Sequence, residues 1–205
     1  KGVFISFEGG EGSGKSSAIT AIKNKLEADG YKVIITREPG GVSVSEQIRN
    51  VLLAVNNQMS KETEALLYAA SRREHITKTI IPALEEGKII LCDRFLDSSL
   101  AYQGKARGLG YEFIESINAY AIKNFTPDCT IFLNLPPEQA FKRKGGVDKT
   151  DRLELSGMEF HNNVYAGYLE LAKMYPERII VIDASGTREQ THNKIISALK
   201  ERGVL

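Results

Sequence analysis

Cysteine and tryptophan are scarce in this chain. Its 205 residues include no tryptophan and two cysteines, Cys92 and Cys129. Each cysteine stands within an apolar run, and the two are too far apart in sequence to form a Cys-x-x-Cys pair. We interpret both as small, buried, reduced side chains rather than as a disulfide or a redox motif.

Long apolar runs are also missing. No stretch approaches the roughly 18 consecutive apolar residues of a membrane-spanning helix. The first apolar run, residues 3–7, leads directly into a glycine-rich loop, and we expect no secretory leader before it. We therefore expect a cytoplasmic protein that has no contact with a membrane.

An excess of positive charge is missing as well. The chain carries 27 Lys and Arg against 26 Asp and Glu, which gives a net charge of +1. A protein that binds a nucleic-acid duplex usually gathers a basic excess on one face. We therefore expect no nucleic-acid partner, and we assign any anion binding to a few individually placed Arg and Lys side chains.

Five short apolar runs have the composition of buried strands. They are rich in Val, Ile and Phe and do not alternate with polar residues, which is typical of parallel strands covered on both faces. The runs span residues 3–7, 31–36, 88–92, 129–135 and 178–183.

Helical patterns lie between these runs. Ala18, Ile19, Ile22 and Leu26 share one helical face, and Gly30 marks its end. Further helices are predicted near residues 61–86, 98–106, 111–125, 137–144, 157–175 and 188–202. The alternation of strand and helix predicts an α/β fold, with a doubly wound five-stranded parallel sheet and helices on both faces. The length suits a single domain over residues 1–205.

Local signals mark some of the helix boundaries. Ser43 to Glu46 and Thr187 to Gln190 each have the spacing of a capping box, in which two side chains satisfy the first backbone N–H groups of a helix. Pro82 is expected to kink or divide the helical stretch 61–86, because proline cannot donate a backbone hydrogen bond.

Segment 143–152 fits neither the strand nor the helix pattern. It contains two glycines and several charged side chains but no apolar face. Two interpretations remain open, a solvated surface loop or a mobile lid over a phosphate site.

A glycine-rich loop after the first strand carries the most specific signal. Residues 9–16 match Gly-x4-Gly-Lys-[Ser/Thr], between a strand and a helix as this motif requires. Its backbone N–H groups and the helix N-terminus can cradle phosphate oxygens. Lys15 is then expected to reach the β- and γ-phosphates, and the hydroxyl of Ser16 to bind Mg²⁺. The motif predicts the fold of the P-loop NTPases.

Two other nucleotide-binding classes fit poorly. A dinucleotide fingerprint needs a third glycine where Ser17 stands. A GTPase switch needs an Asn-Lys-x-Asp run after a later strand, and the chain has none. A kinase fits better, because Asp93 at the end of the third strand is placed to hold Mg²⁺ and Arg94 follows it.

Several runs around these residues make a family resemblance specific. In the order of the family, they are Phe7-Glu8-Gly9, the loop 9–16, Thr36–Gly41, Ala69–Arg73, Asp93-Arg94-Phe95 and Ser98–Gly104. Over nearly the whole chain the sequence resembles the bacterial thymidylate kinases. The resemblance implies a Mg²⁺-dependent nucleoside monophosphate kinase. Such an enzyme transfers the γ-phosphate of ATP to dTMP, giving ADP and dTDP for dTTP supply to DNA synthesis, and works as a homodimer.

The resemblance also assigns the phosphate-handling residues. It places Arg49 and Arg94 on the phosphate of dTMP, Glu11 at the 3′-hydroxyl, and Glu38 near Mg²⁺ or that phosphate. The acceptor is a phosphate oxygen that is already ionised at neutral pH, so no general base is required. The ATP-binding residues implied are Gly9, Gly10, Glu11, Gly12, Ser13, Gly14, Lys15, Ser16 and Ser17.

The base-reading residues follow from the same resemblance. Tyr68 stands where the family stacks an aromatic ring, often phenylalanine, on thymine. Arg72 is implied to donate to the thymine O4, and Gln103 with Ser99 to satisfy the edge around N3. Tyr102 closes the space beside the sugar C2′ and so disfavours a ribonucleotide.

The position of the catalytic cation distinguishes two types within this family. The variable loop positions 10–13 contain no Arg or Lys, whereas segment 143–152 contains Arg143, Lys144, Lys149 and Arg152. The chain thus resembles the type with the arginine in the lid. We predict that Arg143 or Arg152 reaches the γ-phosphate, with packing on adenine as the alternative for Arg143.

Three alternative functions remain open from the sequence. They are a P-loop kinase for another small acceptor such as a deoxynucleoside, a GTPase-like switch, and a nucleotide-binding paralogue without activity. The presence of Lys15, Asp93 and Arg94 argues against the last of these.

Overall fold

The fold centres on one parallel β-sheet. The computed structural model describes residues 2–123 and 125–204. Its strands are β1 (Val3–Glu8), β2 (Val33–Arg37), β3 (Ile89–Asp93), β4 (Cys129–Asn134) and β5 (Ile179–Asp183). They are hydrogen-bonded in the order β2-β3-β1-β4-β5, all parallel, with Ile5 of β1 opposite Leu91 of β3 and Cys129 of β4. The predicted five-stranded parallel sheet is confirmed.

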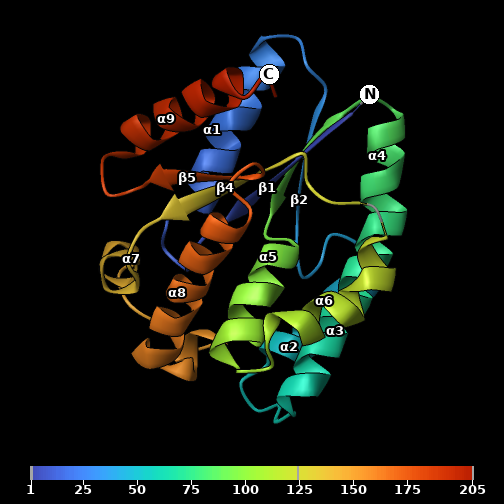
Figure 1. Ribbon diagram of the computed structural model, residues 1–205, viewed down its shortest axis with the longest axis vertical. Helices are drawn as coiled ribbons and strands as arrows, with labels where there is room; N and C mark the ends of the chain where they lie inside the picture. Colours follow the sequence, from blue (N-terminus) through green and yellow to red (C-terminus); the bar gives the residue numbers. More distant parts are fainter. Residues whose placement is uncertain (1, 124, 205) are drawn as a thin grey trace.

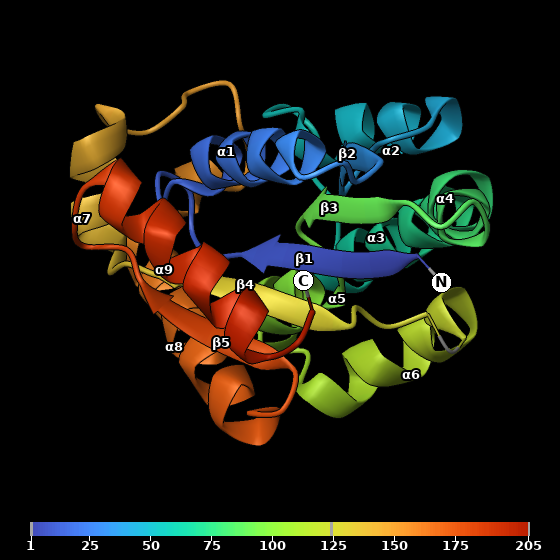
Figure 2. The same cartoon turned by 90° about the horizontal axis from the view of Figure 1, so that it is seen from above.

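Helices cover both faces of this sheet (Figures 1 and 2). Helices α1 (Lys15–Ala28) and α9 (Arg188–Glu201) pack together on one face. On the other face lie α3 (Lys61–His75), α4 (Ile81–Glu85), α5 (Leu96–Ser99) and α8 (Met158–Met174). The remaining helices are α2 (Ser43–Leu53), α6 (Tyr111–Ile122), α7 (Pro137–Lys144) and a short 3₁₀ turn, Glu154–Ser156. The predicted end of the helix 111–125 includes residue 124, which is outside the described residues.

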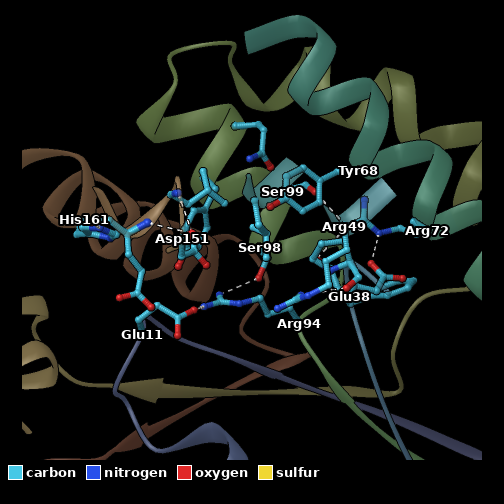
Figure 3. A pocket seen from close by; sticks show the side chains of 17 residues that line it. Glu11, Glu38, Arg49, Tyr68, Arg72, Arg94, Ser98, Ser99, Asp151 and His161 are labelled. Atoms are coloured by element: carbon cyan, nitrogen blue, oxygen red, sulfur yellow. Dashed lines mark hydrogen bonds and ion pairs between the residues drawn. The ribbon is translucent and has the colours of Figure 1, made fainter. Parts of the chain in front are cut away.

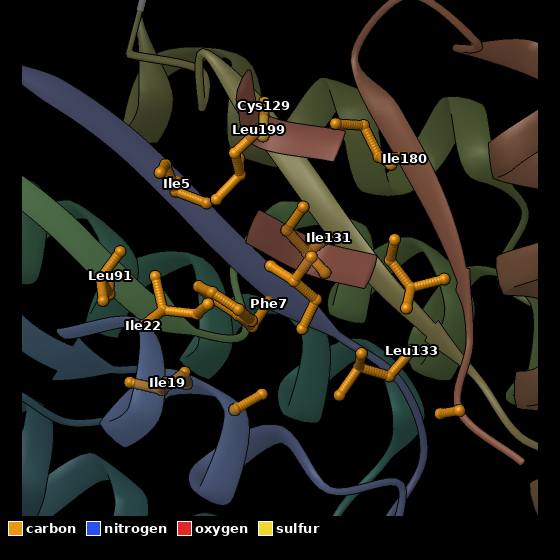
Figure 4. Packing of buried hydrophobic residues seen from close by; sticks show 14 of the residues in the cluster. Ile5, Phe7, Ile19, Ile22, Leu91, Cys129, Ile131, Leu133, Ile180 and Leu199 are labelled. Carbon is orange, nitrogen blue, oxygen red and sulfur yellow. The ribbon is translucent and has the colours of Figure 1, made fainter. Parts of the chain in front are cut away.

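Alternate residues of the central strands point to opposite faces of the sheet and pack into the hydrophobic core on each face. Ile5 and Phe7 of β1 point to the side of α1, where they meet Ile22 (Figure 4). Phe4 points to the opposite side and packs with Ile76. Burying such a side chain stabilises the fold by about 1.5–3 kcal/mol, which explains why these strands read as continuous apolar runs.

The two predicted capping boxes have different outcomes. Thr187 and Gln190 form a capping box at the start of α9, as predicted. The prediction for Ser43 is wrong, because Val42 is the N-cap of α2 and contributes no side-chain hydrogen bond. Glu46 instead accepts from the backbone N of Gly41 at 2.9 Å and pairs with Arg37 at 2.8 Å. The preceding loop therefore uses the carboxylate that a capping box would have needed.

Pro82 divides the helical stretch 61–86, as expected. Helix α3 continues as a π-helix over Ile76–Ile80, and α4 begins just before the proline. Since Pro82 has no N–H, the bond to a carbonyl one turn earlier cannot form, and the wider π turn accommodates this loss. The predicted helix 98–106 likewise starts as α5 and continues as a π-helix, Leu100–Ala106.

Neither a disulfide nor a membrane span is found in the described ranges. Cys92 and Cys129 are both buried and free. None of the helices formed by residues 2–123 and 125–204 combines the length and the apolar character needed to cross a bilayer.

The carboxyl ends of three neighbouring strands place the site. The glycine-rich loop follows β1, Asp93 ends the adjacent β3 and Arg94 follows it, and β4 leads into α7. Open α/β sheets bind ligands in the crevice at this edge, where the strand order reverses direction.

Candidate active site

The glycine-rich loop wraps around the side chain of Lys15. Its Nζ is buried and donates to the carbonyl oxygens of Gly9 and Gly10, both at 3.1 Å. Burial and the nearby charge of Arg94 lower the pKa of Lys15. Gly12 has φ +77°, and a Cβ there would lie 2.3 Å from the carbonyl oxygen of Ala140, so only glycine lets the loop approach α7 this closely.

A wide cleft opens beside this loop, at the N-terminus of α1. It is lined by Glu11, Gly12, Gly14, Lys15, Ser16, Ser17, Arg37, Glu38, Arg49, Asp93, Arg94, Arg143, Lys144 and Arg188. Six of the nine residues predicted to bind ATP line the cleft, and Gly9, Gly10 and Ser13 do not. Arg188, at the start of α9, was not anticipated from the sequence. With its basic side chains and a helix N-terminus, the cleft can hold a polyphosphate.

The second cavity lies between α3, α5 and the segment that follows α7 (Figure 3). Its lining residues are Glu11, Glu38, Pro39, Arg49, Leu53, Tyr68, Arg72, Arg94, Phe95, Ser98, Ser99, Tyr102, Gln103, Asp151, Leu153, Glu154 and His161. All nine residues predicted to bind dTMP are among them.

Arg72 is fixed at one end of this cavity. It is 1% exposed and donates to Glu38 at 2.7 Å and to Ser99 Oγ at 3.0 Å. It also donates to Asn118 Oδ1 at 2.5 Å and to the carbonyl of Phe95 at 3.2 Å. A guanidinium has five N–H groups, so one of them is left without a partner among the described residues.

Arg94, which also lines this cavity, adopts a left-handed backbone, with φ 70°. Such a conformation is uncommon outside glycine and concentrates at functional sites. The Nη1 of Arg94 donates to the Gly9 carbonyl at 3.0 Å, and the guanidinium forms an ion pair with Glu11. It lies 5.0 Å from the ring centre of Tyr102, whose buried hydroxyl has no partner among the described residues. Although burial alone would raise the pKa of Glu11, the charges of Arg94 and Lys15 lower it, so Glu11 is a carboxylate.

Four residues belong to both cavities. Glu11, Glu38, Arg49 and Arg94 line the phosphate cleft and the second cavity alike. Two anions bound in the two cavities would therefore meet across a wall that contains two arginines.

A buried carboxylate, Glu8, supports this wall from below. It accepts from the backbone N of Phe95 at 2.7 Å and from the hydroxyl of Tyr168 at 2.8 Å. Burial, together with the nearby charge of Asp97, raises the pKa of Glu8 to about 7. The bond to Phe95 fixes the backbone directly after Arg94.

Asp93 has a carboxylate oxygen without a hydrogen-bond partner at the phosphate cleft, among the described residues. Its Oδ1 is buried and has no hydrogen-bond partner among residues 2–123 and 125–204. Ser16, on the first turn of α1, lines the same cleft. An unpartnered carboxylate oxygen beside a serine hydroxyl fits a hard cation such as Mg²⁺.

The four basic residues predicted for the lid lie in different places. Arg143 and Lys144 line the phosphate cleft, where Arg143 also donates to the carbonyl of Ala184 at 2.8 Å. Lys149 is exposed and lines neither cavity. Arg152 lines neither cavity and is instead bound to the carbonyl of Leu52 at 2.8 Å and to Glu64 at 2.5 Å. A role for Arg152 at the γ-phosphate therefore stays a prediction, and it requires these bonds to break.

Several lining residues were missed by sequence reasoning. Ser98, Pro39 and Phe95 lie inside runs used for the resemblance, so a signal for them existed. The other missed residues of the second cavity are Leu53, Asp151, Leu153, Glu154 and His161. His161 and residues 151–154 carry no motif, because only the fold brings them over the cavity. Burial lowers the pKa of His161, whose Nε2 lies 3.2 Å from the carbonyl of Glu154.

Comparisons with known proteins give the same family from sequence and from structure. The family model described as thymidylate kinase matches residues 7–195. The thymidylate kinase of Bacillus velezensis is 47% identical over 203 residues, covering 98% of this chain and 96% of that protein. That of Finegoldia magna is 49% identical over 204 residues, covering 99% and 100%. The crystal structure of thymidylate kinase from Ehrlichia chaffeensis superposes with a TM-score of 0.80 at 32% identity, covering 97% of this chain and all of that one. With its P-loop fold, its two adjoining cavities and this breadth of similarity, the chain belongs to the thymidylate kinase family.

Proposed function

We propose that this chain transfers the γ-phosphate of ATP to the phosphate of dTMP, with Mg²⁺, through the residues that line its two cavities. The observation that carries this assignment is the shared wall, because Glu11, Glu38, Arg49 and Arg94 face both cavities. ATP in the cleft and dTMP in the second cavity then have their phosphates on either side of these residues. The chain acts as one kinase domain in which residues 143–152 form the lid.

Transfer is direct and in line, without a covalent intermediate. Lys15 and the loop N–H groups hold the β- and γ-phosphates, while Arg49 and Arg94 hold the phosphate of dTMP. Their positive charges offset the repulsion between two polyanions and stabilise the charge of the transferring group. Arg143, at the lid end of the cleft, is the basic side chain best placed to join them.

Two protein groups at the phosphate cleft would help to hold Mg²⁺. Among the described residues, no group of three or more His, Cys, Asp or Glu is arranged to bind a metal ion. The free Oδ1 of Asp93 and the hydroxyl of Ser16 are the protein groups that fit the ion. When bound, Mg²⁺ supplies charge neutralisation between the phosphates.

The second cavity reads the pyrimidine from three sides. The ring of Tyr68 offers a face for stacking, the free N–H of Arg72 meets the thymine O4, and Gln103 with Ser99 meets N3. Tyr102 lies against the sugar and excludes a 2′-hydroxyl. Glu11, held by Arg94, accepts from the 3′-hydroxyl.

The test is a coupled ADP-release assay across dTMP, dUMP, dCMP, dAMP, dGMP and thymidine. We expect dTMP to have the highest kcat/KM and dUMP to follow, because one methyl group is discriminated by only about 10–200-fold. dCMP presents a donor to Arg72 where dTMP has O4, so rejection on the order of 10⁴-fold is expected. A preference for dCMP or for thymidine itself would exclude dTMP as the acceptor.

Two further proposals concern the setting of the enzyme. We propose a homodimer, as the family resemblance implies; sedimentation equilibrium at micromolar concentration tests it, and a monomer would contradict it. We also propose a cytoplasmic location, since the substrates are intracellular nucleotides and both cysteines are free. Fractionation of cells followed by detection of the chain tests this second point.

A further inference from the structure

Glu64 is a buried carboxylate just behind the second cavity. It stands on α3, one turn before Tyr68, is 1% exposed and lines neither cavity. Its oxygens accept from Gln103 Nε2 at 2.9 Å, from Arg107 Nε at 3.2 Å and from Arg152 Nη2 at 2.5 Å. A buried charge is costly unless it is paired and hydrogen-bonded, and here two arginines compensate it.

These partners determine the ionisation state of Glu64. Burial alone would raise its pKa, but the hydrogen bond from Gln103 and the charge of Arg107 outweigh burial and lower it. Glu64 is therefore ionised at neutral pH. An ionised carboxylate accepts hydrogen bonds and cannot donate one.

The ionised state fixes the orientation of the Gln103 side chain. Only the amide nitrogen of Gln103 can face Glu64, because the reverse orientation would set two acceptor oxygens against each other. The amide oxygen of Gln103 must then lie on the other side, and no donor among residues 2–123 and 125–204 bonds to it. Gln103 is 1% exposed and lines the second cavity, so its free acceptor belongs to the ligand site.

We propose that Glu64 is a positioning residue for base choice: it fixes the Gln103 amide so that only an acceptor meets the pyrimidine N3. This inference rests on the proposed function and extends it to the class of pyrimidine accepted. Thymine and uracil carry a hydrogen on N3 and donate it to this acceptor. Cytosine has an unprotonated N3, so two acceptors face each other and a buried hydrogen bond is lost.

The same carboxylate anchors the end of the lid. Arg152 donates from its backbone N to the carbonyl of Leu53 at 3.0 Å, and its side chain binds the Leu52 carbonyl and Glu64. Glu64 thus joins the residue that reads N3 to the segment that covers the cavity. The orientation of Gln103 and the position of Arg152 therefore both depend on the buried carboxylate of Glu64.

The experiment compares kcat/KM for dTMP, dUMP and dCMP in the unmodified chain, Glu64→Gln and Arg107→Gln. A glutamine at 64 can turn either its oxygen or its nitrogen toward Gln103, so the orientation of Gln103 is no longer fixed. We expect Glu64→Gln to lower the dTMP/dCMP ratio by about tenfold or more. The dTMP/dUMP ratio should change by less than about threefold, because both bases carry the N3 hydrogen.

Arg107→Gln is the matched control. Arg107 contacts Glu64 and Ser156 but lines neither cavity, so this variant disturbs the same ion pair and leaves the Glu64–Gln103 bond in place. We expect its dTMP/dCMP ratio to stay within about threefold of the unmodified value. An equal fall of the ratio in both variants would show a general structural role and overturn the proposal.

The remaining outcomes also decide the question. If Glu64→Gln folds and keeps the unmodified dTMP/dCMP ratio, Glu64 does not position Gln103. If Glu64→Gln fails to fold, the double variant Glu64→Gln/Arg107→Gln replaces it, because this variant also removes the positive charge of Arg107 that Glu64 no longer balances. Its dTMP/dCMP ratio is then compared with that of the unmodified chain by the same criteria. If the unmodified chain does not phosphorylate dTMP, the proposed function fails, which is a different result from an unchanged ratio.

Hydrogen exchange of the Gln103 side-chain amide tests the proposal on the unmodified chain, without any substitution at Glu64. The side-chain amide of Gln103 should show one hydrogen that exchanges slowly with water in NMR spectra, because it is bound to Glu64 inside the fold. The exposed side chain of Gln58 provides the reference for fast exchange. Fast exchange of both Gln103 amide hydrogens would overturn the proposal without reference to any variant.

Discussion

In the proposed mechanism, single side chains carry the phosphate chemistry, and the backbone fixes where they point. The left-handed backbone at Arg94 is held by two bonds, from its own N to the Phe7 carbonyl at 2.9 Å and from Phe95 N to Glu8 at 2.7 Å. Because its backbone and guanidinium are both tied to the strand β1 region, Arg94 needs little rearrangement to meet a phosphate. Such preorganised charge is the main source of catalysis in phosphoryl transfer.

Lys15→Ala tests the charge at the γ-phosphate. We expect turnover to fall by orders of magnitude, about 10²-fold or more, because a preorganised cation is lost at the transferring group. The fold should remain, since the side chain of Lys15 hydrogen-bonds, within residues 2–123 and 125–204, to the carbonyls of Gly9 and Gly10 alone. Steady-state turnover and thermal melting are measured together, and near-normal turnover would remove Lys15 from the mechanism.

Glu8→Gln tests the buried carboxylate below the wall. A carboxyl whose pKa is raised to about 7 in the folded chain stays protonated while the unfolded chain is already ionised, so stability falls as pH rises from about 5 to 7. Below the ordinary Glu pKa both states are protonated, and this effect is absent. Gln mimics the protonated form, so this variant should gain about 2 kcal/mol relative to the unmodified chain between pH 5 and 7.

Urea unfolding of both proteins at pH 5, 6 and 7 measures this difference. Comparing the two proteins at each pH cancels the titration of other groups, including His161. A stability difference that is the same at all three pH values would mean that Glu8 is ionised throughout.

At the scale of elements, the strand-to-loop junctions bring together the residues that line the phosphate cleft, and the segment after α7 continues from that cleft. Gly145 and Gly146 both have positive φ and end α7, so the chain can turn sharply there. Beyond this turn the segment returns to α2 through Arg152, whose N bonds to the Leu53 carbonyl at 3.0 Å. Residues 143–152 therefore connect the phosphate cleft to the second cavity.

Single alanine variants of Arg143, Lys144, Lys149 and Arg152 test the lid. We expect Arg143→Ala to lower kcat by about tenfold or more with little change in dTMP binding, because its side chain lines the phosphate cleft. Lys149→Ala is the control, since that side chain is exposed and lines neither cavity. Unchanged kcat in all four variants would identify residues 143–152 as a solvated surface loop.

Sequence patterns predicted the elements better than their fine structure. The strand predicted for residues 31–36 is observed at Val33–Arg37, because strand ends depend on sheet pairing that local patterns do not show. The π turns before Pro82 and after Ser99 have no sequence period distinct from that of an α-helix. The capping box predicted at Ser43 does not form, because the side chain of Glu46 accepts a hydrogen bond from the backbone N of Gly41, which lies outside the motif.

In the candidate site as well, the sequence predicted what local motifs determine and missed what long-range contacts determine. Residues next to the glycine-rich loop or at the end of β3 were found from local motifs, because the parallel sheet dictates where those ends meet. Glu64 and His161 were missed, since their place at the site depends on contacts with residues far away in sequence, such as Gln103 for Glu64. Long-range packing of this kind leaves no local periodicity for a sequence pattern to detect.

At the scale of the whole molecule, the two cavities lie next to each other at one edge of the sheet, and in the proposed function each holds one ligand. The phosphate cleft is lined by the loop after β1, the first turn of α1, the end of β3 and the start of α9, whereas the second cavity uses α3, α5 and residues 151–154. Both share the wall that contains Arg49 and Arg94. Filling one cavity therefore neutralises charge that also faces the other.

Ligand-linked melting tests this division of the molecule. A ligand present at 100 times its dissociation constant stabilises the folded state by about 2.7 kcal/mol, which raises the Tm of a chain of this size by roughly 5–10 °C. We expect dTMP alone and ATP with Mg²⁺ alone each to raise the Tm, because each has its own cavity. Lys15→Ala should lose most of the ATP shift and keep the dTMP shift, since Lys15 lines only the phosphate cleft. Differential scanning calorimetry of both proteins with each ligand measures these shifts, and loss of both shifts in the variant would show that the two cavities are not independent binding sites.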